Sequence, residues 1–130
     1  MKMSQRKITF YLLLVLIVVA FLYIQYQNSE FNPATKEAET VLSELQSKPI
    51  NYTRHAKCRM QCRKIDQDEV AEILEQGRIN WNKSELNDQP CPTYALEGRT
   101  RDNQNVRIVY ANCLRETKVI TTIDLDKHYD

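Results

Sequence analysis

An apolar run near the N-terminus constrains this chain more than any other feature. Residues 8–24 read ITFYLLLVLIVVAFLYI, seventeen residues that carry no charge and are interrupted only by Thr9. As an α-helix the run is about 26 Å long, near the lower limit for crossing the hydrocarbon core of a membrane. Aromatic rings near both of its ends are typical of the two membrane interfaces. We therefore predict a transmembrane helix over residues 8–26.

A cleaved signal peptide and a buried core helix are the alternatives to this anchor. The residues that follow the run, from Gln25 to Glu30, contain no small-x-small cleavage site, which favours an uncleaved segment. A core helix that is apolar on all sides needs a larger protein around it than the rest of this chain supplies. We expect the run to remain as a signal anchor.

Basic residues predict the orientation of the anchor. Lys2, Arg6 and Lys7 precede the run, whereas no lysine or arginine follows it before Lys36. Positive charge is retained on the cytoplasmic side of membranes. We therefore expect residues 1–7 to form a cytoplasmic basic tip and the rest of the chain to lie outside, in a periplasm or the extracellular space.

Charge and length limit what the exposed part can be. The first 25 residues hold three of the 18 lysines and arginines and none of the 17 acids, so the remainder has a formal charge of minus two. This balance predicts no general attraction to nucleic acid. No acid occurs between Lys48 and Ile65, however, and the bases there form one local basic surface: Lys48, Arg54, Lys57, Arg59, Arg63 and Lys64. It is either a solvated helix face or an anion site.

A helical stalk or linker is predicted over residues 27–50. Asn32 can cap a helix whose first residue is Pro33, and Pro49 stops it. Apolar residues recur at helical spacing along it: Ala34, Ala38, Val41, Leu42 and Leu45. This narrow stripe could lie on the domain, pair with a copy of itself, or only separate the domain from the lipid.

The remaining residues, 51–130, suffice for one small domain. Thr53 is a suitable N-cap for a helix from about Arg54 to Arg63.

A further helix should follow directly. Asp66 and Glu69 form a capping-box pattern at its start, and we expect Gly77 to end it in the left-handed conformation. Its predicted buried residues are Val70, Ile73 and Leu74.

After this helix the apolar period changes to that of strands. Strands are predicted at 93–100, 106–112 and 118–125, with a short fourth at 78–81. On one strand Val106, Ile108 and Tyr110 share a face, and on the next we expect the same of Val119, Thr121 and Ile123. The predicted fold is α+β: after the transmembrane helix, a two-layer domain of two or three helices packed on a three- or four-stranded antiparallel sheet.

The helix predicted at 54–63 carries the densest cluster of reactive side chains. His55, Arg59 and Arg63 are spaced four apart and share one helix face. An imidazole that moves a proton, beside guanidinium groups that stabilise a phosphate oxyanion, is what metal-independent phosphodiester cleavage requires. Glu97 or Asp124 could instead pair with these bases in a purely structural role.

The four cysteines are candidates for disulfides or for a metal site. Outside the cytoplasm an even count favours disulfides. Cys58 and Cys62 leave one helix nearly in parallel, which disfavours a bond between them, so we expect each to pair with Cys91 or Cys113. Both thiols would then face the sheet. A zinc site formed by all four thiolates is the alternative, and unpaired buried thiols are a third.

Several segments together resemble a known family. The stretch YTRHAKCRMQCRKIDQDEVAEILEQGRI, followed by YALEG, VRIVYAN and KVITTIDL, is similar to the bacterial domain of unknown function 4258 over about residues 51–125. Its order of elements looks similar to the RelE and BrnT toxin ribonucleases. By that analogy, the resemblance implies an RNA-binding surface and carries catalytic roles over to His55, Arg59, Arg63 and Arg107.

Two functions follow from these observations. The first is an anchored domain outside the cytoplasm that binds an anionic ligand or a protein partner through its basic helix face. The second is a metal-independent ribonuclease, or an inactive relative of one, for which RNA would be the partner. The predicted export and the net acidic domain favour the first.

Overall fold

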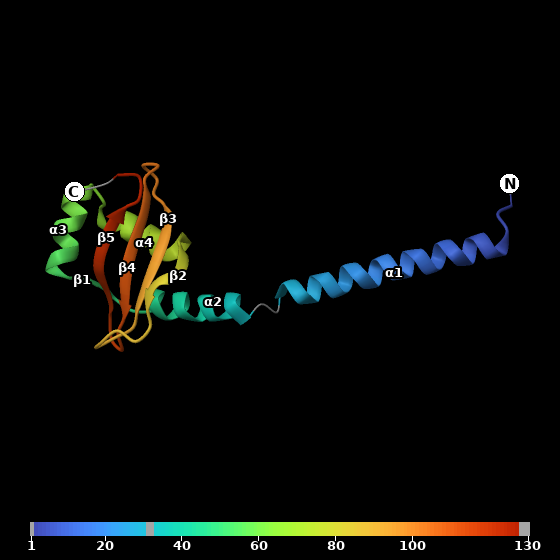
Figure 1. Ribbon diagram of the computed structural model, residues 1–130, viewed down its shortest axis with the longest axis horizontal. Coiled ribbons are helices and arrows are strands. Elements are labelled where there is room, and N and C mark those ends of the chain that lie inside the picture. The colour runs from blue at the N-terminus through green and yellow to red at the C-terminus, as the bar shows by residue number, and fades with distance from the viewer. Residues whose placement is uncertain (1, 31–32, 128–130) are drawn as a thin grey trace. The chain divides into compact units, whose positions relative to one another are not determined.

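The computed structural model describes residues 2–30 and 33–127. The chain folds as two units, Met1–Glu37 and Ala38–Asp130. The predicted cap at Asn32 lies outside the described residues. Helix α1, Gln5–Glu30, is continuous over 26 residues (Figure 1). The segment Gln5–Asn28 is long and apolar enough to cross a membrane, and none of it is buried within the protein.

Helix α2, Pro33–Gln46, ends three residues before Pro49. Its second half belongs to the second unit, and Val41 and Leu45 are buried in the core of that unit. The main-chain oxygen of Leu45 accepts a hydrogen bond from the Thr117 hydroxyl at 2.7 Å. Of the three roles left open for the apolar stripe, packing on the domain is therefore the one found.

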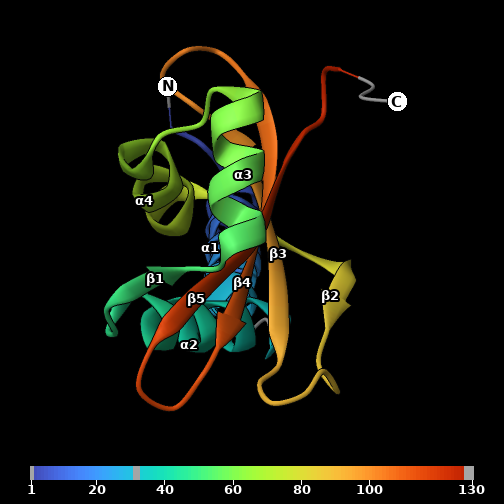
Figure 2. The same ribbon diagram turned by 90° about the vertical axis from the view of Figure 1, so that its left-hand side faces the viewer.

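The domain is built on a five-stranded sheet with the order β1-β5-β4-β3-β2 (Figure 2). The strands are β1 Ile50–Tyr52, β2 Arg78–Glu85, β3 Thr93–Arg99, β4 Asn105–Asn112 and β5 Thr117–Asp124. Side chains from α2, α3 (Arg54–Arg63) and α4 (Gln67–Gln76) form one core with the sheet. The predicted α+β class is confirmed.

The predicted sheet was too small and too regular. Strand β1 was missed, and it pairs in parallel with β5, so the sheet is mixed rather than antiparallel. The main-chain N–H groups of Thr117 and Thr53 donate to the carbonyls of Pro49 and Val119 and bracket this pairing. Three residues between Pro49 and Thr53 carry too short a pattern for recognition, because only the neighbouring β5 makes them a strand.

Strand β5 contains a bulge that changes which side chains face the core. The register of β4 against β5 runs from Val109–Thr121 to Tyr110–Val119, which leaves Ile120 as the extra residue. The buried side chains of β5 are Thr117, Val119, Thr122 and Asp124. The expectation that Val119, Thr121 and Ile123 share a face is therefore wrong, because an extra residue reverses the alternation beyond it. For β4 the prediction is confirmed, since Val106, Ile108 and Tyr110 are fully buried.

The starts of α3 and α4 follow the predicted caps. The Thr53 hydroxyl accepts a hydrogen bond from the Ala56 N–H at 3.0 Å and donates to the Ile120 carbonyl at 3.1 Å. At α4 the Asp66 carboxylate accepts from the Glu69 N–H at 2.8 Å, and the Glu69 carboxylate accepts from the Asp66 N–H at 3.3 Å. Both caps satisfy main-chain donors that a helix start leaves unpaired.

Gly77 ends α4, although not in the predicted left-handed conformation. Its backbone is extended, with φ −69° and ψ 161°. A Cβ at this position would lie 2.4 Å from the carbonyl oxygen of Ile73. Glycine is therefore required here by the close approach of the backbone rather than by a positive φ. The left-handed cap occurs instead at Lys64, which ends α3 with φ 54°.

Candidate functional site

Helix α3 presents its basic and thiol-bearing side to solvent. Ala56 and Met60 face the core, whereas Cys58 and Cys62 are exposed. The expectation that the two thiols face the sheet is therefore wrong. Helix α3 packs along β5, and the alanine and the methionine fill the space between this helix and the sheet.

His55 and Arg59 form the part of the predicted cationic face that the structure brings together. The Arg59 Nε donates to the His55 Nε2 at 3.4 Å, and the imidazole is exposed. The contact places an imidazole and a guanidinium side by side on α3.

Arg63 takes a different role from the other two. Its Nη1 donates to the main-chain carbonyl of Thr122 on β5, and its side chain is half-buried. The carbonyl of Arg63 also accepts from Gln104 Nε2 at 3.0 Å, which joins the end of α3 to the turn between β3 and β4. Arg63 therefore fastens α3 to the sheet.

Arg107 lies on the other side of the sheet. It alternates with the fully buried Val106 and Ile108, so its side chain projects from the sheet face that the helices do not cover. Its Nε and Nη2 each approach Glu97 Oε1 at 2.7 Å. The structure therefore does not bring Arg107 together with His55.

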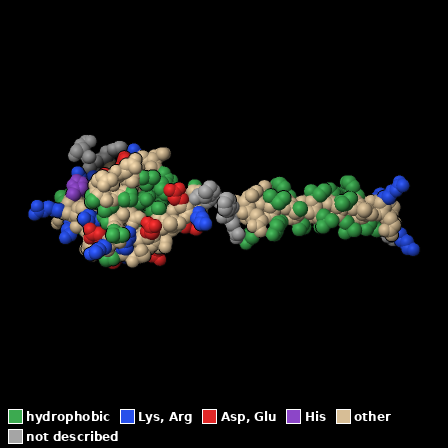
Figure 3. Space-filling view, turned by 90° about the horizontal axis from the view of Figure 1, so that it is seen from below, with side chains coloured by type: hydrophobic (Ala, Val, Ile, Leu, Met, Phe, Trp, Pro, Cys, Tyr) green, Lys and Arg blue, Asp and Glu red, His purple; other side chains and the backbone are tan. Residues whose placement is uncertain are grey.

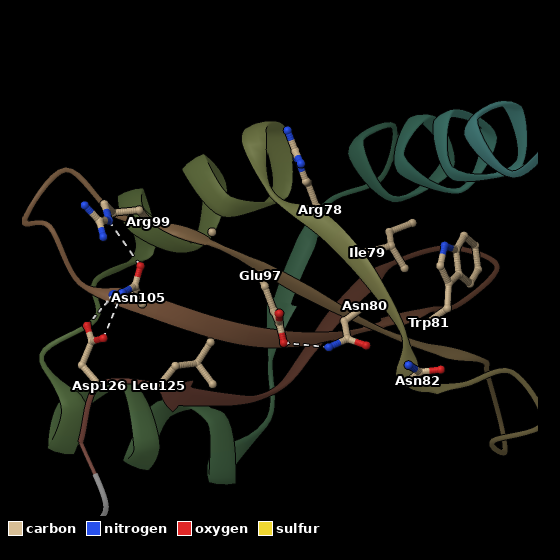
Figure 4. A pocket seen from close by; sticks show the side chains of 11 residues that line it. Arg78, Ile79, Asn80, Trp81, Asn82, Glu97, Arg99, Asn105, Leu125 and Asp126 are labelled. Atoms are coloured by element: carbon tan, nitrogen blue, oxygen red, sulfur yellow. Dashed lines mark hydrogen bonds between the residues drawn. The ribbon is translucent and has the colours of Figure 1, made fainter. Parts of the chain in front are cut away.

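Glu97 is a preorganised carboxylate on this open face. The same oxygen, Oε1, also accepts from Asn80 Nδ2 at 2.9 Å (Figure 4). The hydrogen bond from Asn80, and then the guanidinium of Arg107, lower the pKa of Glu97, which is therefore ionised at neutral pH. The expectation that Glu97 pairs with the bases of α3 is therefore wrong, because its base partner is Arg107 on the open face. Asp124 accepts from Gln104 Nε2 at 2.8 Å.

A shallow groove of about 870 Å³ runs beside Glu97. Its walls come from β2, from the ends of β3 and β4, and from the residues after β5, and they include Arg78, Trp81, Arg99, Leu125 and Asp126 (Figure 4). No sequence pattern predicts this groove, because its residues come from four separate segments. Trp81, the one tryptophan of the chain, was the available signal.

The cysteines pair differently from the prediction. Cys91 and Cys113 form a disulfide with a Cα–Cα distance of 5.1 Å, and Cys58 and Cys62 are free. The predicted bonds from helix to sheet are therefore wrong. Cys91 precedes β3 and Cys113 follows β4, and these two antiparallel neighbours bring the thiols together, as the Asn112 N–H donating to the Pro92 carbonyl at 2.8 Å also indicates.

The same arrangement separates the four thiols that were considered for zinc. Two lie on the outer side of α3, and the other two are bonded to each other. Within residues 2–30 and 33–127, no group of three or more His, Cys, Asp or Glu side chains is placed to hold a metal ion.

A family model for a domain of unknown function, DUF4258, matches residues 52–124. The chain belongs to the DUF4258 family. The matched part contains α3, α4 and strands β2 to β5, and with them His55, Arg59, Arg63, Arg107 and the four cysteines. No curated protein and no solved structure matches the chain, so the similarity to RelE and BrnT stays a prediction.

Proposed function

We propose that this chain is a single-pass membrane protein that exposes a DUF4258 domain outside the cytoplasm as a binding module. One observation carries the proposal: α1 presents large apolar side chains to its surroundings over its whole circumference. A helix that is apolar on every side and unburied requires a lipid environment. The basic residues Lys2, Arg6 and Lys7 support a cytoplasmic N-terminus.

The cysteine chemistry supports the proposed side of the membrane. A disulfide such as Cys91–Cys113 persists in oxidising compartments and is rare in the cytosol. The binding surface of the proposed module is the exposed side of α3, defined by Arg54, His55, Lys57, Cys58, Arg59 and Cys62 and called here the α3 surface. It carries bases and no acid, and it therefore attracts anionic ligands.

A pair of fusions tests the location. Alkaline phosphatase, which is active only outside the bacterial cytoplasm, is fused after Asp130, and the matched control carries it before Met1. We expect activity from the C-terminal fusion alone. Activity of the N-terminal fusion alone would reject both the location and the compartment assigned to the disulfide. Replacing Lys2, Arg6 and Lys7 by glutamine should weaken the orientation bias.

A metal-independent ribonuclease is the second candidate, and the contact between Arg59 and His55 is the observation that favours it. RNA incubated with the purified protein and a chelator provides the test. Cleavage that His55→Ala abolishes and Gln61→Ala, on the same helix, retains would support this function. No cleavage by the unaltered protein would reject it, and full activity of His55→Ala would reject the assigned base.

A further inference from the structure

The α3 surface is organised as two lines of positive or polar groups around two thiols. At 3.6 residues per turn, Arg54 and Lys57 lie along one side of the exposed arc, and His55 and Arg59 lie along the other. Cys58 and Cys62 fall between these lines, and both are exposed. Figure 3 shows lysine and arginine side chains gathered beside the histidine at this end of the domain.

The next helix carries the opposite charge. Helix α3 contains four bases and no acid, whereas α4 contains no base and, besides the buried Glu69, the acids Asp68, Glu72 and Glu75. Although the domain is close to neutral as a whole, its two central helices form a charge dipole. A negatively charged surface attracts such a domain by α3 and repels it by α4, so the surface orients the domain as well as binding it.

We propose that the α3 surface rests on the anionic phospholipid headgroups of the membrane that α1 spans. This inference depends on the proposed anchoring. The ten Cα–Cα steps from Asn28 to Ala38 reach at most about 35 Å, so the domain remains near the headgroups. Tethering of this kind raises the effective concentration of the lipid surface at α3, and weak charge attraction is then sufficient for docking.

The composition of the α3 surface favours lipid over an acidic protein. Protein interfaces depend on a few large apolar or aromatic anchors that enter pockets. On the described part of the domain the exposed large apolar side chains lie elsewhere, at Trp81, Leu86, Leu114 and Leu125. Anionic lipid headgroups bind basic side chains through charge attraction and need no apolar anchor. The α3 surface, which offers bases without such an anchor, therefore suits a layer of phosphate groups.

The two free thiols provide a built-in measurement of this docking. The full-length protein is placed in nanodiscs of phosphatidylcholine, or of phosphatidylcholine mixed with phosphatidylglycerol. The rate at which a neutral maleimide modifies Cys58 and Cys62 is then followed by mass spectrometry. We expect slower modification in the anionic discs, on the order of fivefold or more, because one base near an anionic surface contributes about that factor. High salt should restore the rate.

Charge reversal supplies the matched variants. Arg54→Glu with Lys57→Glu reverses two bases of the α3 surface, and Arg78→Glu with Lys83→Glu makes the same change in net charge on β2. Only the first pair should abolish the difference between the two lipids. Because each variant is compared with itself in both discs, altered intrinsic reactivity of the thiols cancels.

The outcomes separate this inference from the function on which it rests. A protein that alkaline carbonate extracts from membranes is not anchored, and the proposed function fails. An anchored protein with equal rates in both discs overturns the lipid contact alone. Protection in both lipids, or protection that survives high salt, also overturns it and points to contact with another protein surface.

Discussion

At the scale of single residues, Glu69 is a buried acid whose pKa is strongly raised. Its side chain is fully buried, and Oε1 has no hydrogen-bond partner within the described part of the chain. Burial, followed by the neighbouring carboxyl of Asp102, raises the pKa of Glu69 to about 7. The carboxyl that completes the cap of α4 is thus protonated over much of the acidic range.

This pKa predicts a pH-dependent stability. Between about pH 4.5 and pH 7 the folded state holds a proton that the unfolded state has lost, so the free energy of unfolding falls as pH rises through this window, by at most about 1.4 kcal/mol per unit. Denaturant unfolding at several pH values measures it. Glu69→Gln should flatten the profile, whereas Glu75→Gln on the exposed side of α4 should not. If the free energy of unfolding of Glu69→Gln still falls with pH as in the unaltered protein, another group causes the fall.

The two glycines of the chain provide a second prediction for single residues, because an added Cβ meets different atoms at each. A Cβ at Gly77 would lie 2.4 Å from the Ile73 carbonyl oxygen, whereas one at Gly98 would meet the mobile end of the Ile73 side chain at 2.9 Å. Gly77→Ala must move the backbone, so we expect it to lower the free energy of unfolding by roughly 2–4 kcal/mol. Gly98→Ala should lower it by less. Thermal unfolding checks the order, and equal losses would contradict the backbone contact.

At the scale of elements, α2 belongs to the core and is more than a linker. Leu45 is fully buried, whereas Leu114, in the turn after β4, is 95% exposed. Leu45→Ala should therefore lower the free energy of unfolding by about 2–5 kcal/mol, and Leu114→Ala should change it by less than about 0.5 kcal/mol. Denaturant unfolding of both variants measures the difference. A neutral Leu45→Ala would show that α2 is dispensable for the fold.

At the scale of the whole molecule, the disulfide contributes to the free energy of unfolding. Cys91–Cys113 closes a loop with a sequence separation of 22, and a loop of this size contributes about 3 kcal/mol through the unfolded state. The double substitution Cys91→Ser with Cys113→Ser should remove most of this stabilisation, and reductant should have the same effect on the unaltered protein. Cys58→Ser with Cys62→Ser is the control and should be nearly neutral. Stability that reductant leaves unchanged would contradict the bond.

Local signals in the sequence determined the helices of the domain. Thr53 and the pair of Asp66 and Glu69 were correctly assigned as caps, because the hydrogen bonds of a cap join residues only three apart. The period of the apolar residues likewise determined the buried face of α4 and the α+β class. The basic helix of the candidate site was recognised for the same reason.

Only the tertiary structure decided how these elements meet. The bulge at Ile120 depends on the register against β4, and the disulfide depends on which strands are neighbours. The separation of Arg107 from His55 depends on which sheet face the helices cover. A sequence pattern describes contacts along a few residues, whereas strand pairing joins residues far apart, and many registers satisfy the same alternation. The packed core selects one of them.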